Sequence, residues 1–240
     1  MTVSNLKKLI PGPLKNTAKE AFLGHKFRRA LRRIGKLPQG ELPSRGLLDE
    51  LQAGWRNEGF AASCDYLQEV MKLALATSGP ILECGSGLTT LLIGLAAGRR
   101  GIKTYSLEHI PEWRNLVNDV LVRYKIPNVD VLLSPLRDYG EFTWYEPPLA
   151  QLPEKFPLVI CDGPPGTTSG GRYGLLPVFG KRLPEGSLIL FDDAGRAGEA
   201  EVLRRWSAQW NVNVSMRDDL MKTFAMVAVD GGCVPNALHP

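Results

Sequence analysis

The sequence has no long uninterrupted run of apolar residues, and its 240 residues include only four cysteines. The first absence excludes a helix that crosses a bilayer, and residues 1–13 lack the apolar core of a signal peptide. Cys64, Cys84, Cys161 and Cys233 form no CxxC pair and show no metal-ligand spacing, so we expect no disulfide. These absences predict a cytoplasmic protein.

Internal repeats and low-complexity tracts are also absent. With 44% hydrophobic residues, the chain is large enough for one substantial α/β domain with a short appendage. We expect a basic helical leader in residues 1–40 and a helical segment in residues 41–79 that caps the core. The core itself should occupy residues 80–230, followed by a tail in residues 231–240.

Acidic residues are scarce at the start of the chain. Residues 1–40 hold ten Lys or Arg and one acidic residue, whereas the remaining 200 residues hold 19 basic and 24 acidic residues. Within residues 23–36, apolar side chains recur at helical spacing and basic side chains fill most other positions. Such a helix can contact an anionic membrane surface or an acidic partner, or it can be docked to the body with a solvated face. Nucleic acid is not an expected partner, because no aromatic interleaving or nucleic-acid motif accompanies the charge.

Short apolar segments alternate with helical patterns from residue 80 onward. The predicted strands, in chain order, are residues 80–83, 103–108, 129–133, 158–161, 187–191, 212–216 and 224–229. This alternation predicts an α/β fold: a doubly wound, seven-stranded, mostly parallel sheet with helices on both faces, preceded by an N-terminal helical extension. Residues 217–223 are too few for a crossover helix, so the last strand should run antiparallel at one edge.

The turn after the first strand carries two glycines one residue apart. Gly85 and Gly87 follow Glu83, and a helical apolar pattern begins directly at Leu88. Glycine allows positive φ and a close approach of the backbone, and the free N–H groups of the first helical turn face whatever binds there. Taken by itself, the turn fits both a ligand cradle and a plain strand-to-helix connection.

Polar residues follow every strand that should end at one edge of the sheet. These residues are Glu83, Glu108 with His109, Ser134, Asp162, and Asp192 with Asp193. Ligands of open α/β sheets bind outside the carboxyl ends of the strands. Carboxylates gathered at a partly buried edge repel one another and lose hydration, so a purely structural sheet would not need them. The repetition therefore favours a ligand site.

The glycine turn also indicates which ligand to expect. A dinucleotide fingerprint requires a third glycine where this chain has Thr90, and Glu83 would repel a pyrophosphate but attract a cation. The segment from Glu83 to Thr90, together with Glu108, resembles the cofactor site of class I S-adenosylmethionine-dependent methyltransferases, which have a Rossmann-like fold. The resemblance covers about residues 60–230 and includes the strand pair at the end of the chain.

The resemblance implies a role for each residue of this site. Glu83 would bind the ammonium group of S-adenosylmethionine, Glu108 would bind its ribose with His109 beside the adenine, and Asp162 would face the methyl-transfer centre. The other cofactor contacts that it implies are Gly85, Ser86, Gly87, Thr89, Ser134 and Leu136. From the residues alone, His109 equally fits an exposed loop, and Ser134 a strand cap.

Asp162 and Asp193 are the candidate catalytic residues, and with Asp192 they are the candidate metal ligands. They resemble the carboxylates that hold a divalent ion in metal-dependent catechol-type O-methyltransferases, where hard oxygen ligands suit Mg²⁺ or Ca²⁺. The chain departs from that pattern in residues 163–166 and 192–196, which are similar to segments of uncharacterised bacterial methyltransferases. Without a metal, Asp162 or Asp193 would act as a general base, or Asp193 would pair with Arg196.

Arg172 and Tyr173, which follow the loop 163–171, are the candidate substrate residues. Arg172 could bind an acidic substrate through two parallel hydrogen bonds, or it could support a helix start at the surface. The leading expectation is in-line O-methylation of a hydroxyl on a small molecule or glycan. The alternatives are another nucleotide-binding Rossmann-like enzyme, such as an NAD-dependent enzyme or an aminopropyltransferase, and a non-catalytic cofactor-binding protein at a membrane surface. The motifs specify neither the acceptor nor the oligomeric state.

Overall fold

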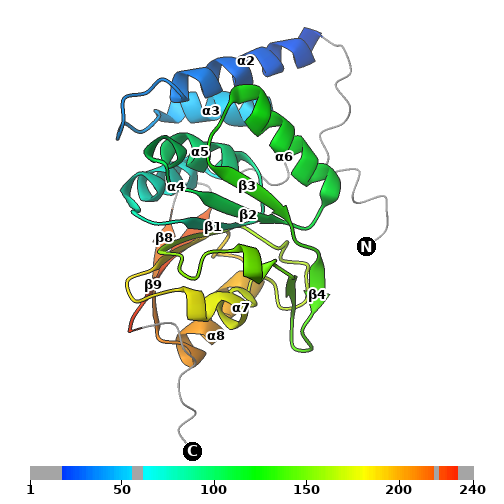
Figure 1. Ribbon diagram of the computed structural model, residues 1–240, viewed down its shortest axis with the longest axis vertical. Coiled ribbons are helices and arrows are strands. Elements are labelled where there is room, and N and C mark those ends of the chain that lie inside the picture. Colours follow the sequence, from blue (N-terminus) through cyan, green and yellow to red (C-terminus); the bar gives the residue numbers. More distant parts are fainter. Residues whose placement is uncertain (1–17, 56–61, 219–221, 232–240) are drawn as a thin grey trace, which may run out of the picture.

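The structure is a computed structural model that describes residues 18–55, 62–218 and 222–231. Within these residues, seven strands form one sheet in the order β3-β2-β1-β6-β7-β9-β8 (Figure 1). Their bounds are β1 (Ile81–Cys84), β2 (Thr104–Glu108), β3 (Val129–Leu133), β6 (Leu158–Cys161), β7 (Leu188–Phe191), β8 (Val212–Asp218) and β9 (Thr223–Val229). Each coincides, to within about two residues at either end, with a strand that the sequence predicts.

The sheet is parallel except for its last strand. β3, β2, β1, β6 and β7 pair in parallel, whereas β9 pairs antiparallel with both β7 and β8. The predicted fold class is therefore confirmed. Because β9 runs opposite to β7, with Ala225 beside Phe191, its first residues lie at the edge where the parallel strands end.

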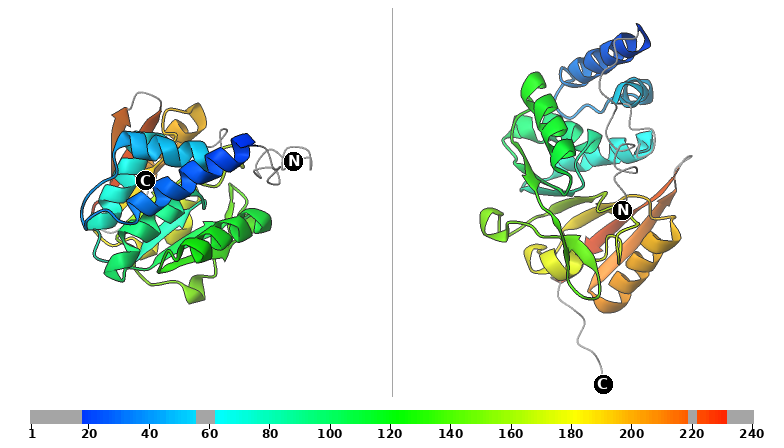
Figure 2. Two further views of the ribbon diagram at one scale, coloured as in Figure 1. Left: turned by 90° about the horizontal axis from the view of Figure 1, so that it is seen from above. Right: turned by 90° about the vertical axis from the view of Figure 1, so that its right-hand side faces the viewer.

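Helices cover both faces of the sheet (Figures 1 and 2). One face carries α4, α5 and α6, with α2 and α3 packed beyond them as an outer pair, and the other face carries α7 and α8. The helix bounds are α2 (Ala18–Ile34), α3 (Arg45–Trp55), α4 (Cys64–Ala76), α5 (Leu88–Ala96), α6 (Pro111–Tyr124), α7 (Leu175–Phe179) and α8 (Ala197–Gln209).

Each central strand is buried on both faces. In β1, Ile81 packs into the core shared with α4 and α5, whereas Leu82 and Cys84 pack into the core shared with α7 and α8. Side chains alternate along a strand, so a continuous apolar run supplies both cores. Glu83 interrupts this run and is nevertheless completely buried, so its carboxylate requires partners inside the protein.

A hairpin occupies the long connection between β3 and β6. It consists of β4 (Leu136–Asp138) and β5 (Thr143–Tyr145), and Trp144 and Tyr145 of β5 are buried in the core. Of these aromatic residues, Tyr145 lies beside His109 at the end of β2, whereas Trp144 packs against Phe179 of α7. The connection is partly structured, as its length suggests.

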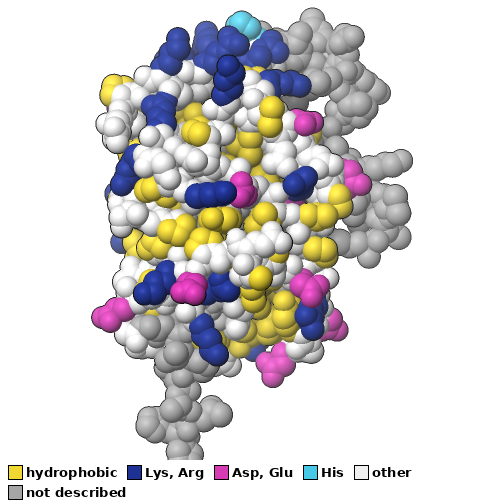
Figure 3. Space-filling model, in the orientation of Figure 1, with side chains coloured by type: hydrophobic (Ala, Val, Ile, Leu, Met, Phe, Trp, Pro, Cys, Tyr) yellow, Lys and Arg dark blue, Asp and Glu magenta, His cyan; other side chains and the backbone are white. Residues whose placement is uncertain are grey.

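The apolar side of α2 is buried and its basic side faces outward. Phe27, Ala30, Leu31 and Ile34 belong to the core, and the ring of Phe27 lies 5.6 Å from that of Trp55. The outward side lines a basic groove, and its basic side chains form the dark blue surface at the top of Figure 3. The groove is lined by His25, Arg28, Arg29, Arg32, Arg33 and Lys36. This helix is docked to the body. Membrane contact through residues 23–36 stays a prediction.

Four stretches of the predicted domain organisation lie outside the described residues. They are residues 1–17 of the basic leader, 56–61 of the helical cap, 219–221 of the core and 232–240 of the tail. Among the helices that the structure describes, none has the length and apolar character needed to cross a membrane.

Candidate active site

The glycine turn lies where the strand order reverses. β1 pairs with β2 on one side and with β6 on the other, and the connections from these strands leave in opposite directions. At this edge the backbone N–H of Gly85 donates to the carbonyl of Leu107 at 3.0 Å, and that of Asp162 donates to the carbonyl of Cys84 at 2.9 Å. Such a switch point is the usual binding crevice of an open α/β sheet.

The two glycines of the turn have different surroundings. Gly85 has φ of 90°, and a Cβ added there would lie 3.0 Å from the carbonyl oxygen of Asp162. A side chain at this position would therefore be strained and would press on the end of β6. At Gly87 an added Cβ would have no atom of the described residues within 4 Å. The turn is packed against protein at Gly85 and borders open space at Gly87.

Glu83 holds the first turn of α5 in place. Its Oε1 accepts a hydrogen bond from the Thr89 hydroxyl at 2.6 Å, and its Oε2 accepts one from the Thr90 hydroxyl at 2.6 Å. The Thr90 oxygen also accepts from the backbone N–H of Gly87 at 2.8 Å. Burial raises the pKa of Glu83 to about 7. Thr90, where a dinucleotide site has glycine, thus links Glu83 to the turn, and direct contact of Glu83 with a cofactor stays a prediction.

Glu108 is fully hydrogen-bonded at the end of β2. Its Oε1 accepts from the backbone N–H groups of His109 and Ile110 at 2.8 and 2.9 Å. Its Oε2 accepts from the hydroxyl of Ser86 at 2.8 Å and from the backbone N–H of Ser86 at 3.2 Å. The indole N–H of Trp113 in α6 donates to the carbonyl of Ser86 at 2.7 Å. The structure thus places Glu108, the residue predicted to bind the ribose, in direct contact with the glycine turn.

The other predicted cofactor residues surround Glu108. The backbone N–H of Ser134 donates to the carbonyl of Glu108 at 2.7 Å, and the Ser134 side chain is buried with its hydroxyl 3.3 Å from the carbonyl of Leu132. Leu136 begins β4, opposite Tyr145. The ring of Tyr145 lies 6.0 Å from that of His109. These residues therefore gather around the end of β2, although Ser134 makes the contacts of a strand cap.

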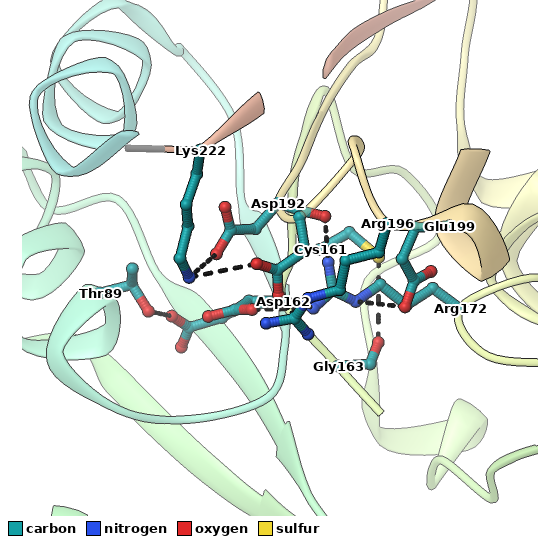
Figure 4. Close-up of polar contacts among 11 residues, drawn as sticks. Thr89, Cys161, Asp162, Gly163, Arg172, Asp192, Arg196, Glu199 and Lys222 are labelled. Carbon is teal, nitrogen blue, oxygen red and sulfur yellow. Dashed lines mark hydrogen bonds and ion pairs between the residues drawn. The ribbon is translucent and has the colours of Figure 1, made fainter. Parts of the chain in front are cut away.

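Asp162, Asp192 and Asp193 converge at the ends of β6 and β7 (Figure 4). Each offers a carboxylate oxygen within 4.8 Å of the other two. Asp193 has φ of 56°, a left-handed conformation that aspartate tolerates better than most residues. Burial and the neighbouring Asp192 raise the pKa of Asp162, while Arg172 opposes that shift. A carboxylate with a raised pKa is better suited to accept a proton near neutral pH.

Arg172 lies inside this cluster instead of at the surface. Its side chain is 2% exposed, and its Nη2 lies 3.0 Å from Asp162 Oδ1 and 3.3 Å from Asp193 Oδ2. Its Nη1 donates to the backbone carbonyl of Asp192, and its Nε lies 3.8 Å from the buried Glu199. Every part of the guanidinium is therefore next to an internal acceptor. The interpretation of Arg172 as a surface residue is wrong, because the loop folds inward, and its contact with a substrate stays a prediction.

Tyr173 points away from the acid cluster into the core of α8. Its hydroxyl donates to Gln209 at 2.7 Å, and the indole N–H of Trp206 donates to its carbonyl at 3.0 Å. Its ring is buried against Phe142. In this arrangement Tyr173 supports the position of Arg172, and its predicted contact with a substrate stays a prediction.

Three residues of the site are absent from the sequence-based prediction. Lys222, directly before β9, has its Nζ 3.1 Å from Asp193 Oδ1, and Glu199 of α8 faces Arg172. Tyr66 of α4 has a buried hydroxyl with no hydrogen-bond partner among the described residues, and burial, Asp192 and Asp162 raise its pKa. One signal was available for Lys222, because an antiparallel strand beside β7 must begin at the edge where β7 ends.

The comparisons with known proteins place the fold. No family model and no curated protein matches the sequence. Among solved structures, the cofactor-bound protein Rv0187 from MTB has a TM-score of 0.56 at 16% identity, over 95% of this chain and 96% of that chain. The SAH-bound methyltransferase PaMTH1 of Podospora anserina has a TM-score of 0.56 at 13% identity, over 91% of this chain and 99% of that chain.

A third solved structure extends this likeness to an O-methyltransferase. TomG from Streptomyces achromogenes, an O-methyltransferase involved in tomaymycin synthesis and solved in complex with SAM, has a TM-score of 0.51 at 12% identity over 95% of each chain. At these identities the likeness establishes architecture. The chain has the fold of S-adenosylmethionine-dependent methyltransferases, as the glycine turn and the strand ends predict.

Proposed function

We propose that this chain is an S-adenosylmethionine-dependent methyltransferase that methylates a hydroxyl of a small molecule or glycan. The observation that carries the proposal is the meeting of Glu108 and the glycine turn at the switch point between β1 and β6. A carboxylate at the end of β2 can accept hydrogen bonds from ribose hydroxyls in exchange for that of the Ser86 hydroxyl, and open space at Gly87 leaves room for the amino-acid end of a cofactor.

The turn disfavours a dinucleotide. Thr90 is completely buried and its hydroxyl joins Glu83 to Gly87, in place of the glycine that a pyrophosphate site uses for close packing. An ionised Glu83 beside the turn would repel a pyrophosphate and attract an ammonium group. These contacts favour S-adenosylmethionine over NAD. The decarboxylated cofactor of aminopropyltransferases keeps the ammonium group, and it differs in having no carboxylate for the backbone N–H groups at the start of α5.

Asp162 is the proposed proton acceptor. It follows β6 directly beside Gly85, and its side chain is 25% exposed and pairs with Arg172, whereas Asp193 is 7% exposed and pairs with Arg172, Arg196 and Lys222. In the transfer, a lone pair of the acceptor oxygen forms the new bond to the methyl carbon. The carbon–sulfur bond breaks with its electron pair going to the sulfonium sulfur, and the hydroxyl proton goes to Asp162. The protein supplies orientation and proton transfer for this displacement.

The test is the formation of S-adenosylhomocysteine from S-adenosylmethionine in the presence of a panel of catechols, hydroxy acids and sugars. We expect the by-product to form with at least one acceptor class, which gains one methyl group by mass spectrometry. Glu108→Ala should lose this activity, whereas Glu185→Ala, in the exposed loop before β7, should retain it. By-product formation that is equal with and without every acceptor, or equal in Glu108→Ala, would contradict the proposal.

A further inference from the structure

Three carboxylates that converge on one point are the usual protein ligands of a divalent cation. Asp162, Asp192 and Asp193 meet this description, since their oxygens lie within 4.8 Å of one another. A hard cation needs these oxygens to be available to it, because Mg²⁺ and Ca²⁺ bind through six or more oxygen atoms. The surroundings of the three carboxylates therefore decide whether an ion fits.

Basic side chains already occupy the space between these carboxylates. The ammonium of Lys222 lies 3.1 Å from Asp193 Oδ1 and 3.9 Å from Asp192 Oδ2, and it points into the cluster in Figure 4. Arg172 lies 3.0 Å from Asp162 Oδ1, and Arg196 Nη1 lies 2.9 Å from Asp193 Oδ2. Both oxygens of Asp193 are thereby paired with cations. A divalent ion placed among these groups would be repelled by all three.

The local charge is close to balanced without an ion. Four carboxylates meet here, those of Asp162, Asp192, Asp193 and Glu199, against the three basic side chains. Arg172 and Asp193 are buried and bind each other, whereas the side chains of Lys222 and Asp162 are 26% and 25% exposed. An incoming acceptor would therefore meet Lys222, Asp162 and the more exposed Arg196 before the buried Arg172 and Asp193. The cluster of four carboxylates and three basic side chains therefore does not fit a divalent metal ion.

We infer that the ammonium of Lys222 takes the place of a divalent metal ion among these carboxylates and binds the oxygen of the methyl acceptor, so that methyl transfer needs no metal. This inference rests on the proposed function for its catalytic part. As the acceptor oxygen attacks the methyl carbon and its proton goes to Asp162, Lys222 stabilises the negative charge that develops on that oxygen. Asp193 and Asp192 hold the ammonium of Lys222 in position, as they would hold a metal ion.

Ion titrations of variants at position 222 test the inference without an acceptor. Lys222→Gln removes the positive charge and adds an amide oxygen, whereas Lys222→Arg keeps the charge. The matched control is Lys72→Ala, which removes a lysine from the exposed Lys72–Glu69 pair on α4. Each protein is titrated with Tb³⁺, followed by luminescence sensitised through its aromatic residues, and with Ca²⁺ by calorimetry. Circular dichroism verifies that each variant is folded.

We expect saturable ion binding to Lys222→Gln at least about tenfold tighter than to the wild-type chain, to Lys222→Arg and to Lys72→Ala. Equal binding by the wild-type chain and Lys222→Gln would overturn the inference. Where an acceptor has been identified, excess EDTA should leave the wild-type rate unchanged, and a rate that EDTA abolishes and Mg²⁺ restores would also overturn it. Calorimetry of S-adenosylhomocysteine on the same proteins tests the proposed function separately, because a failure to bind it does not depend on Lys222.

Discussion

The hydroxyl of Ser86 donates a 2.8 Å hydrogen bond to Oε2 of Glu108, the same oxygen that accepts the backbone N–H of Ser86 at 3.2 Å. With His109 and Ile110 on Oε1, all four acceptor positions of this carboxylate are taken. A ribose hydroxyl that binds Glu108 must therefore displace the Ser86 hydroxyl. The glycine turn and the proposed ribose site are coupled through these two hydrogen bonds of Ser86.

Ser86→Ala tests this coupling. It removes the donor that competes with the ribose while leaving the backbone N–H in place, so the affinity for S-adenosylhomocysteine should rise by about fivefold, equivalent to about 1 kcal/mol. The measurement is isothermal titration calorimetry, with Ser207→Ala on the outer side of α8 as the control. An affinity more than about tenfold weaker would mean that the Ser86 hydroxyl itself binds the cofactor, as the sequence-based prediction has it.

The pKa of Glu83 predicts a pH dependence of cofactor binding. Burial raises this pKa to about 7, so the carboxylate of the free protein becomes ionised only as the pH approaches neutrality. If Glu83 binds the cofactor ammonium, affinity should increase between about pH 5.5 and 8, by up to about tenfold per unit below the pKa. Glu83→Gln should bind weakly and without this dependence. A wild-type affinity that is constant over this range would exclude the ammonium contact.

Stability should change with pH in the opposite direction. Because the folded-state pKa of Glu83 lies above the ordinary value of 4.5, the folded protein binds a proton more tightly than the unfolded chain. The contribution of this group is therefore fully present below pH 4.5 and is lost as the pH rises to about 7. Thermal unfolding of the ligand-free protein and of Glu83→Gln across this range measures the difference.

The two glycines of the turn should respond differently to alanine. Gly85→Ala places a Cβ at φ of 90° and 3.0 Å from the Asp162 carbonyl, so it should destabilise the fold by about 1–3 kcal/mol. Gly87→Ala has open space around its Cβ, so its free energy of unfolding should lie within about 0.5 kcal/mol of the wild-type value. It should nevertheless bind S-adenosylhomocysteine more weakly, because the methyl group enters the proposed cofactor space. Urea denaturation and calorimetry separate these effects, and wild-type binding by Gly87→Ala would place the cofactor elsewhere.

Arg172 should be a structural requirement of the acid cluster. Its guanidinium is buried between Asp162, Asp193 and Glu199, and Arg172→Ala would leave buried carboxylates without a counter-charge. The free energy of unfolding should fall by about 3–5 kcal/mol. Arg204→Ala, which breaks the exposed pair with Glu201, should change it by less than about 1 kcal/mol. Wild-type stability of Arg172→Ala with weakened substrate binding would instead support the substrate role predicted from the sequence.

We expect the protein to adsorb to anionic membranes through the basic side of α2 without inserting into them. Its apolar residues are buried in the core, so attraction would come from the outward basic groove and would weaken with salt. The triple variant Arg28→Glu, Arg32→Glu and Lys36→Glu should lose sedimentation with vesicles that contain phosphatidylserine. Equal sedimentation of the wild-type chain with phosphatidylserine and with neutral phosphatidylcholine vesicles would contradict electrostatic adsorption.

The sequence was sufficient for the sheet and for the residues at its edge. The seven strands, their mostly parallel pairing and the positions of Glu83, Glu108 and Asp162 follow from local patterns, because parallel strands end at one edge and their last residues gather there. The contacts within the acid cluster do not follow from local patterns. Arg172 turns inward because three carboxylates and the backbone carbonyl of Asp192 surround it, and no spacing along the chain encodes that meeting.

Calorimetric titration with S-adenosylhomocysteine tests the central claim most directly. The wild-type chain and Glu185→Ala should bind it with micromolar affinity, whereas Glu83→Ala and Glu108→Ala should show no measurable binding. These two carboxylates lie at the ends of β1 and β2, on either side of the glycine turn. Binding that is unchanged in both variants would contradict the assignment of the cofactor site.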